Sequence, residues 1–220
     1  AAADIDIQLW DTGSLTSLER TFNGANSFDE DLTVWDWRQV RTTKYMFAGA
    51  EVYDNDGAAF TVNTTPDLVN TSGMFFSADV FNQPIAMNVS GVTDAGRMFG
   101  YTGAFNQNLS SLSFADGVNL DQIFIDTDAF NNGDPGNNGE KPLVWNDFLV
   151  GSFGRALFRA SSFNQDISSW QMGQCTSLSE TFSGASLFNL GEQPGEPKTT
   201  DGQPLAADRS NLFSWDWDTS

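Results

Sequence analysis

The stretch SSFNQDISSW, residues 161–170, contains a phrase that the chain repeats. The triplet FNQ also occurs at 81–83 and 105–107, and the pattern of Asp, Ile or Leu, two residues and Trp occurs at 6–10 and 31–35. Self-similarity at a regular interval is the sequence signature of repeat architectures. The phrase therefore predicts a chain built from repeated units.

An F-x-x-A-x-x-F pattern defines seven such units. We call its first apolar residue the anchor; a small residue follows three positions later and an aromatic residue six positions later. The anchors are Phe22, Phe47, Phe75, Phe99, Phe124, Leu157 and Phe182. The second aromatic residues are Phe28, Tyr53, Phe81, Phe105, Phe130, Phe163 and Phe188. Because Phe and Trp carry so much of the apolar surface, we expect an aromatic core.

Each unit has a predicted strand half and a predicted helical half. The strand half is the string apolar-x-x-apolar-x-apolar, as in Leu32, Trp35 and Trp37. A further apolar residue three positions later extends this string to the leucine-rich-repeat pattern. The last two apolar residues of the string are two positions apart, so they share one face of a short strand. The helical half places Leu18, Phe22 and Ala25 at i, i+4 and i+7, so that they share one helix face. Thr16 and Glu19 form a possible capping box for this helix.

The units predict an α/β repeat solenoid that is leucine-rich-repeat-like, with about seven coils of about 25 residues. Short parallel strands would line the concave side and short helices, α or 3₁₀, the convex side, since strands stack at about 4.8 Å and helices at about 8–10 Å. Residues 1–220 would form one domain. Its parts would be an N-terminal partial coil at 1–17, loop insertions on one edge at 131–141 and 190–210, and a C-terminal strand at 211–220. A third insertion of about three residues lies at 54–57 or at 63–67, and alignment of Phe60 and Val62 with the Trp-x-Trp positions favours 63–67.

An Asn or Asp follows the second aromatic residue in every unit. A row of ligands is one interpretation. The interpretation that we prefer is structural, with side chains at a coil corner that bond to the backbone of the same or the next coil. The row is Asp29, Asp54, Asn82, Asn106, Asn131, Asn164 and Asn189.

Charge and composition exclude several classes of function. The 29 acidic and 10 basic residues give a net charge of −19, which disfavours nucleic acids and anionic membranes as partners. The acidic excess either keeps the chain soluble in a salty or calcium-rich medium or forms a surface for a cationic partner. The chain has no His, so the usual catalytic triads, zinc sites and imidazole catalysis are absent, and we predict no enzyme. A glycan-processing enzyme that uses a pair of carboxylates is a third alternative. No run approaches the roughly 18 apolar residues of a membrane span.

Candidate partner-binding residues come from the outward row of the predicted strands and from the two long insertions. The outward row is Asp11, Asp36, Thr61, Val89, Ser113, Asn146, Gln171 and Asp216. The insertion carboxylates are Asp134, Glu140, Glu192 and Glu196. Concave surfaces and insertions are where repeat proteins bind partners, although such a row is also what an exposed sheet face looks like.

Two further kinds of site are suggested by short motifs. Asp54 and Asp56 in DNDG (54–57) have the clustered oxygens and the Gly turn that calcium favours, and a solvated acidic turn is the alternative. We predict no other cofactor. Asn63, Asn70, Asn88 and Asn108 lie in N-x-S/T sequons, which a chain rich in Asn, Ser and Thr also contains by chance.

The phrases MFGYTGAFNQNLS (98–110) and LFRASSFNQDISSW (157–170) resemble the repeat of BspA-like leucine-rich-repeat surface proteins. The resemblance covers roughly residues 5–189 and the last strand. It implies a leucine-rich-repeat-like solenoid displayed outside the cell, with adhesion or partner binding as its role. The chain departs from that family in having no N-terminal lipobox Cys, only seven full units and two long insertions.

These observations predict a non-catalytic exported protein that binds a protein or glycan. The alternative is a structural subunit of a larger assembly or filament, docked through the insertion edge and the terminal coils. AAADIDIQLW (1–10) reads as a mature end left by signal cleavage. The expected location is therefore extracellular or at the cell surface, with an organelle lumen as the alternative.

Overall fold

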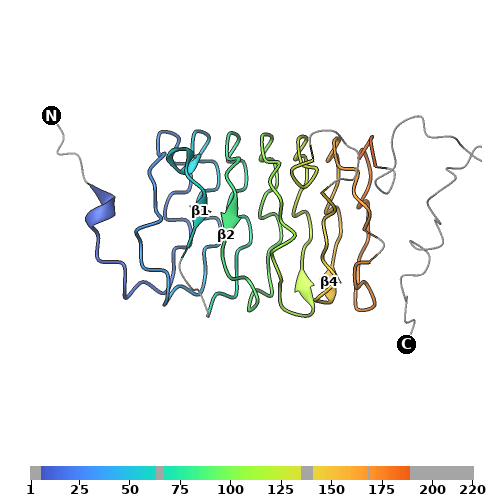
Figure 1. Cartoon of the computed structure of the whole chain (residues 1–220), viewed down its shortest axis with the longest axis horizontal. Coiled ribbons are helices and arrows are strands. Elements are labelled where there is room, and N and C mark those ends of the chain that lie inside the picture. Colours follow the sequence, from blue (N-terminus) through green and yellow to red (C-terminus); the bar gives the residue numbers. More distant parts are fainter. Residues whose placement is uncertain (1–5, 63–66, 135–140, 168, 189–220) are drawn as a thin grey trace, which may run out of the picture.

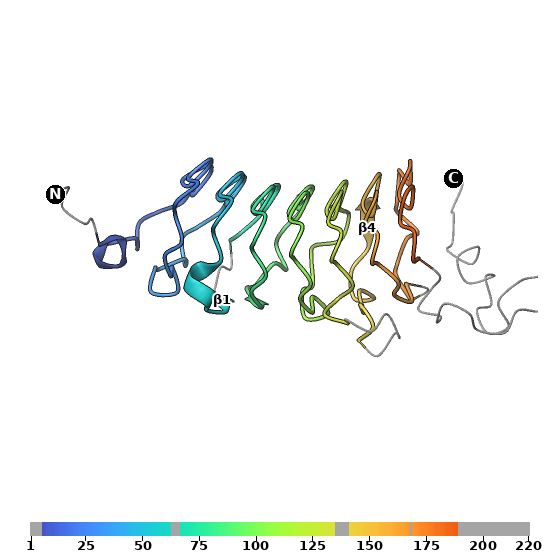
Figure 2. The ribbon, with the colours of Figure 1, turned by 90° about the horizontal axis from the view of Figure 1, so that it is seen from above.

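The computed structural model describes residues 6–62, 67–134, 141–167 and 169–188. The chain runs as a row of stacked coils, which both ribbon views show (Figures 1 and 2). Regular secondary structure is sparse in this part of the chain. The elements are the 3₁₀ helices η1 (Ile7–Leu9) and η2 (Asn55–Gly57) and the strands β1 (Phe60–Thr61), β2 (Ile85–Ala86), β3 (Val118–Asn119) and β4 (Val150–Ser152).

Neighbouring coils pair in parallel. Strand β1 pairs with β2, and β3 pairs with β4. Single parallel bridges continue this pairing at the position five residues before the anchor. They join Ser17, Thr42, Asn70, Asp94 and Asn119 in succession. Equivalent positions of successive units therefore lie next to each other along the stack.

Consecutive turns occupy the segments predicted to be helices. Alternate N–H groups donate to the next coil, for example from Leu18 to the Thr42 carbonyl at 2.9 Å and from Phe22 to Met46 at 2.8 Å. The intervening N–H groups donate three residues back, as Thr21 does to Leu18 at 3.3 Å. An α-helix would direct all of these groups to the carbonyl four residues back, and a 3₁₀ helix would direct all of them to the carbonyl three residues back. The prediction of a helix around each anchor is therefore wrong for the described coils.

Positive φ angles explain why no helix forms. In every described coil, the residues two before and two after the anchor have φ between 50° and 79°. Such angles interrupt a right-handed helix and cost roughly 1–2 kcal/mol at each residue other than Gly. Hydrogen bonds between coils offset this cost. These residues are Arg20, Gly24, Tyr45, Gly49, Gly73, Ser77, Arg97, Tyr101, Gln122, Asp126, Arg155, Arg159, Glu180 and Gly184.

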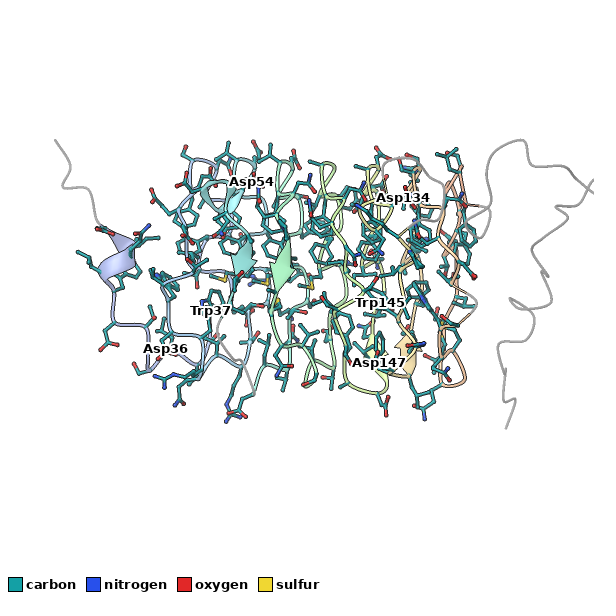
Figure 3. All side chains as sticks on the ribbon, in the orientation of Figure 1. Asp36, Trp37, Asp54, Asp134, Trp145 and Asp147 are labelled. Carbon is teal, nitrogen blue, oxygen red and sulfur yellow. The ribbon has the colours of Figure 1, made fainter. Side chains whose placement is uncertain are left out.

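Two columns of stacked aromatic rings run through the core, beside buried Leu, Ile, Val and Met side chains. The first five anchors, Phe22 to Phe124, stack with centroids 5.5 to 5.8 Å apart and interplanar angles of 6° to 9°. Within a coil, an aromatic anchor stacks on the second aromatic residue at 3.8 to 4.4 Å. Trp37 and Trp145 fill the strand side of this core (Figure 3), and their indole N–H groups donate to the carbonyls of Leu32 and Leu109. The aromatic residues of the repeat therefore bury one another from coil to coil.

The small third insertion lies at 54–57. Phe60 in β1 pairs with Ile85 in β2, although Phe60 lies thirteen residues after its anchor and Ile85 only ten after its own. The three additional residues must therefore precede β1, where η2 forms an extra turn. The preference for 63–67 is wrong, because it rests on residue type and not on strand register.

Candidate functional site

The residue after the second aromatic accepts a hydrogen bond from the backbone N–H of its counterpart in the next coil. The distances from N to the side-chain oxygen are 2.7 to 2.9 Å throughout. The ladder runs through Asp29, Asp54, Asn82, Asn106, Asn131 and Asn164. The structural interpretation of this row is confirmed, since its oxygens are engaged by the protein itself.

The Gln of the FNQ phrase completes the ladder. The Gln83 side-chain amide donates to Asp54 Oδ2 at 2.7 Å, and that of Gln107 donates to the Asn82 carbonyl at 2.7 Å. Gln165 donates to the Asn131 carbonyl at 3.0 Å and to its Oδ1 at 2.8 Å. Each Gln therefore ties its own coil to the Asn or Asp of the preceding coil.

The DNDG corner belongs to the same hydrogen-bonded system. Asp54 accepts through Oδ1 from the Asn82 N–H and through Oδ2 from Gln83, and Asp56 is exposed. The N–H groups of Asp54 and Asp56 both donate to Asp29 Oδ1, at 2.7 and 3.1 Å. Within the described ranges, no group of three or more His, Cys, Asp or Glu side chains is placed to hold a metal ion. Both carboxylate oxygens of Asp54, one of the two residues that suggested calcium, thus have partners in the ladder.

The insertion at 131–141 opens with the same corner geometry. The N–H groups of Asn131 and Gly133 both donate to Asn106 Oδ1, each at 2.8 Å. The buried Asn132 accepts from the Leu109 N–H at 2.8 Å, as the buried Asn55 does from Leu32 at 3.3 Å. A buried Asn with positive φ therefore begins both insertions; in the first of them, only the neighbouring Asp54 and Asp56 were singled out from the sequence, as a calcium motif.

The predicted partner-binding residues do not form one surface. In Figure 3, Asp36 lies at one edge of the coils and Asp134 at the opposite edge. Asp11, Asn146 and Gln171 are exposed. Asp36 is half-buried and pairs with Arg38 at 2.5 Å. The hydrogen bond from Arg38 lowers the Asp36 pKa to about 2.

Two members of the predicted surface are buried. Val89 is 1% exposed, because residues 85, 87 and 89 face the core together once the register of β2 is set by β1. Asp134 is 3% exposed, and its N–H donates to the Asn131 carbonyl at 3.0 Å. Both assignments were wrong. Thr61 is exposed and Ser113 half-buried, whereas Glu140, Glu192, Glu196 and Asp216 lie outside the described residues.

The sequons differ in their surroundings. Asn88 and Asn108 are exposed. Asn70 is half-buried, with its Oδ1 accepting from the Ser72 N–H at 2.9 Å and its Nδ2 donating to Asp94 at 3.4 Å. The nitrogen that would carry a glycan at Asn70 is thus engaged between coils. Asn63 lies outside the described residues.

Asn70 belongs to a second polar row that sequence reasoning missed. Five residues before the anchor, a side-chain oxygen accepts from the N–H two residues later, at 2.9 to 3.4 Å. The signal was a short polar residue at this position in every unit. The row is Ser17, Thr42, Asn70, Asp94, Asn119 and Ser177.

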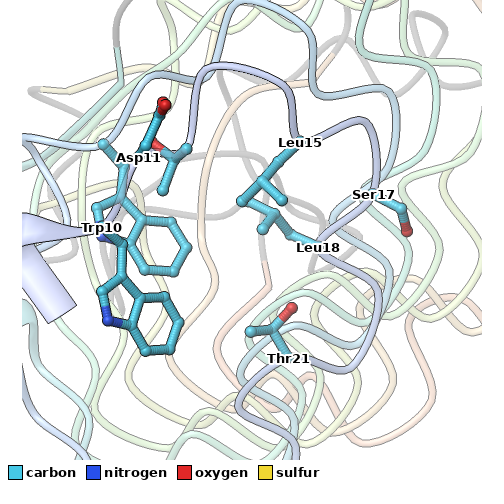
Figure 4. A pocket seen from close by; sticks show the side chains of 8 residues that line it. Trp10, Asp11, Leu15, Ser17, Leu18 and Thr21 are labelled. Atoms are coloured by element: carbon cyan, nitrogen blue, oxygen red, sulfur yellow. The ribbon is translucent and has the colours of Figure 1, made fainter. Parts of the chain in front are cut away.

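Two hollows lie beside these rows. The larger, of about 420 Å³, opens at the first coil, where Trp10 stacks on Trp35 with centroids 6.0 Å apart (Figure 4). The smaller, of about 210 Å³, is polar and contains Asp94, Asn119 and Asp121. Asp121 Oδ1 accepts from the Ser152 hydroxyl and the Gly154 N–H, both at 2.6 Å. The carboxylates of the smaller hollow are therefore already hydrogen-bonded.

The turns around the anchors carry a third candidate site. Six residues from the first four coils form what we call the turn-face patch. They are Arg20, Lys44, Tyr45, Phe76, Arg97 and Tyr101. Sequence reasoning missed the patch, because it compared only the apolar residues around each anchor between units, and the patch residues lie between three positions before and two positions after the anchor.

No helix in the described part of the chain is long and apolar enough to span a membrane.

Comparison with known proteins places the chain in a family of unknown function. No curated protein and no solved structure matches the chain. A family model matches three successive stretches, residues 2–68, 63–141 and 137–194, which confirms a repeat protein. These matches cover most of the 220 residues, and the chain therefore belongs to the family described as Mycoplasma protein of unknown function, DUF285.

Proposed function

We propose that this chain is a non-catalytic, exported repeat protein that acts by binding a protein or glycan partner. The observation that carries the proposal is the use of the recurring polar residues. Asn82, Asn106 and Asn131, with Gln107 and Gln165, are engaged in hydrogen bonds between coils. What varies from coil to coil is the exposed residues of the turns, which is how repeat proteins build binding surfaces on a constant scaffold.

A leucine-rich-repeat-like solenoid of the BspA-like class is the architecture that we propose for this function. Parallel pairing of successive coils and a continuous aromatic core support it. The FNQ phrase that carries the resemblance has a structural role here, since Asn106 and Gln107 bond to Asn82 of the preceding coil. An extracellular or cell-surface location, or an organelle lumen, belongs to the same proposal.

The carboxylates near the polar hollow support a non-catalytic role. A general acid–base pair needs groups free to exchange protons with a substrate. Asp121 accepts two hydrogen bonds at 2.6 Å, and Asp94 accepts from the Gly96 N–H at 3.1 Å and from Asn119 at 3.2 Å. These carboxylates brace the coils.

A structural subunit of a larger assembly is the second candidate, and the first coil favours it. Leu9 is 82% exposed, and Trp10, which lines the cavity of about 420 Å³ (Figure 4), is 48% exposed. Large apolar side chains around an open cavity are typical of surfaces that another chain covers. A neighbouring subunit at this end would bury both residues.

The size of the native material separates the two candidates. A binding protein is expected to be recovered as a monomer whose melting temperature rises when its partner is added. Recovery only in one stoichiometric assembly would overturn the first candidate and support the second. A Leu9→Ser, Trp10→Ser variant is the matched control, since it should release a subunit from an assembly and leave partner binding by a monomer unchanged.

A further inference from the structure

The turn-face patch gathers cations on a chain whose net charge is −19. We propose that this patch binds an acidic segment of a protein partner. The proposal rests on the proposed function and deepens it, because it names the surface and the class of partner. Four properties of the patch support it, namely its alignment, its charge, its aromatic composition and its rigidity.

Backbone hydrogen bonds between coils align Arg20, Tyr45 and Arg97, which each lie two residues before the anchor of their coil. The Arg20 N–H donates to the Lys44 carbonyl, the Tyr45 N–H to Ser72 and the Arg97 N–H to Asp121, each at 2.9 Å. Equivalent positions thus succeed one another at the coil spacing, which is 5.5 to 5.8 Å in the adjacent column of rings. The patch is a linear surface that an extended segment can follow.

The cations of the patch have no carboxylate partner among the described residues. The four ion pairs found there involve Arg38, Arg41, Arg155 and Arg159, all outside the patch. The Arg20 guanidinium and the Lys44 amine both lie over the Tyr45 ring, at 5.5 and 5.9 Å from its centroid. Two like charges above one ring repel each other. A carboxylate from outside would relieve this repulsion.

Arg97 offers the same chemistry at the other end of the patch. Its Nε donates to Gln122 Oε1 at 3.2 Å, and its side chain is exposed. A guanidinium anchored in this way can present its remaining N–H groups to a carboxylate in bidentate geometry. The patch therefore contains two cationic groups. Arg20 and Lys44 form the first, Arg97 forms the second, and aromatic rings lie between them.

The rings favour a protein over a highly charged polymer. Tyr45 and Phe76 are half-buried, and Tyr101 is 44% exposed. Exposed aromatic residues beside Arg have the composition of protein–protein hot spots. Asp94 and Asp121 lie in the hollow beside Tyr45 and Arg97, so a polyanion of high charge density would meet these carboxylates as well as the cations. A short acidic segment with apolar neighbours avoids that repulsion.

Two glycines hold the rings in place. A Cβ at Gly73 would overlap the Tyr45 ring, and one at Gly100 would lie 3.3 Å from the ring of Phe76. The ring of each coil therefore lies against the backbone of the next. Phe76 contacts Tyr101 edge to face, with centroids 5.2 Å apart. A surface that is ordered before binding loses less entropy on association.

The test is titration of the full chain with a fluorescent peptide of alternating Glu and Leu. We expect binding that weakens as salt rises. The Arg20→Gln, Lys44→Gln variant and the Arg97→Gln variant should each weaken binding roughly tenfold, a loss of about 1.4 kcal/mol. Tyr101→Ala should weaken it severalfold. Arg38→Gln and Arg41→Gln, which change cations outside the patch, should stay within about twofold.

Several results of these measurements would overturn the proposal. The proposal fails if the peptide does not bind, if the control variants weaken binding as much, or if oligogalacturonate binds more tightly through the same residues. Concentration-dependent dimers that these variants abolish would assign the patch to a second copy of this chain. Urea midpoints equal to wild type establish that the variants are folded. If the peptide titration fails but the native chain is a monomer that binds a partner, only the inference about the patch is overturned. If the native chain is recovered only in an assembly, the proposed function itself is overturned.

Discussion

The side-chain oxygen of Asn131 accepts a hydrogen bond from the backbone N–H of Asn164, 33 residues later, at 2.7 Å. The corresponding bond from Asn106 to Asn82 spans 24 residues at 2.8 Å. The insertion between Asn131 and Asn164 thus lengthens the coil without changing the ladder. The ladder, and not the length of the repeat, sets the spacing of the coils.

Replacing Asn131 with Ala should destabilise the fold strongly. Asn131 is 1% exposed, and removal of its side chain leaves the Asn164 N–H without its acceptor and the Gln165 amide with only the Asn131 backbone carbonyl. Each unsatisfied buried group costs about 1–3 kcal/mol, so we expect a loss of about 2–4 kcal/mol in urea unfolding. Asn108→Ala is the matched control, because Asn108 is exposed and accepts from Ser110 two residues away. Equal losses in the two variants would contradict a structural ladder.

Gly73→Ala tests the packing of rings over the turns. Gly73 has φ of +62°, and a Cβ there would overlap the Tyr45 ring. Gly57 has φ of +72°, and a Cβ there would have nothing within 4 Å, so Gly57→Ala carries the backbone strain alone. We expect a loss of roughly 1 kcal/mol at Gly57 and about 2–4 kcal/mol at Gly73. Urea unfolding of the two variants measures both losses.

A second substitution isolates the clash at Gly73. In a Tyr45→Ala background, Gly73→Ala should cost about as much as Gly57→Ala does, because the ring is absent. The difference between backgrounds is the coupling energy of a double-mutant cycle. A cost at Gly73 that is unchanged by Tyr45→Ala would show that the ring does not rest on this glycine.

Much of the architecture could be predicted from the sequence because it depends on residue type at fixed intervals. The paired aromatic residues, such as Phe99 and Phe105, are buried and stacked, and the Asn row bonds to the neighbouring coil. Both follow from the requirement that a short unit buries its apolar face and pairs its polar groups with its neighbours.

The backbone conformation could not be predicted in the same way. The spacing of Leu18, Phe22 and Ala25 fits a helix face, and it also fits turns that repeat along the stack. The positive φ at Arg20 decides between the helix and the turns. A Gly at this position would have indicated a positive φ from the sequence, and an Arg does not. The register of β2, which buries Val89, depended on where the three-residue insertion lay. The hydrogen bonds of the second polar row depend on that conformation, although its short polar residue recurs in every unit.

Chelation should leave the stability of the chain unchanged. Asp54 accepts hydrogen bonds through both carboxylate oxygens, from the Asn82 N–H at 2.9 Å and the Gln83 amide at 2.7 Å. A cation at DNDG would have to displace the Gln83 bond. We therefore expect equal melting temperatures with calcium and with a calcium chelator. A fall on chelation that Asp56→Asn abolishes would instead establish a calcium site at residues 54–57.

The stability of the chain should fall at alkaline pH through Tyr53. Burial, followed by the nearby charges of Asp29, Asp31 and Asp54, raises the Tyr53 pKa well above its ordinary value of 10.0. The neutral phenol donates to Asn55 Oδ1 at 3.1 Å and is the form that the fold retains. Because the folded pKa is the higher one, the contribution is complete below pH 10.0 and is lost as the unfolded chain ionises above it.

Urea unfolding across this pH range, in wild type and in Tyr53→Phe, measures the effect. The variant loses the bond to Asn55 and should be less stable at neutral pH. Its stability should nevertheless decline less steeply above pH 10.0, since Phe has no proton to release. Tyr101→Phe is the control, because it removes the same hydroxyl from a side chain that is 44% exposed. Parallel declines in wild type and Tyr53→Phe would assign the alkaline loss to other groups.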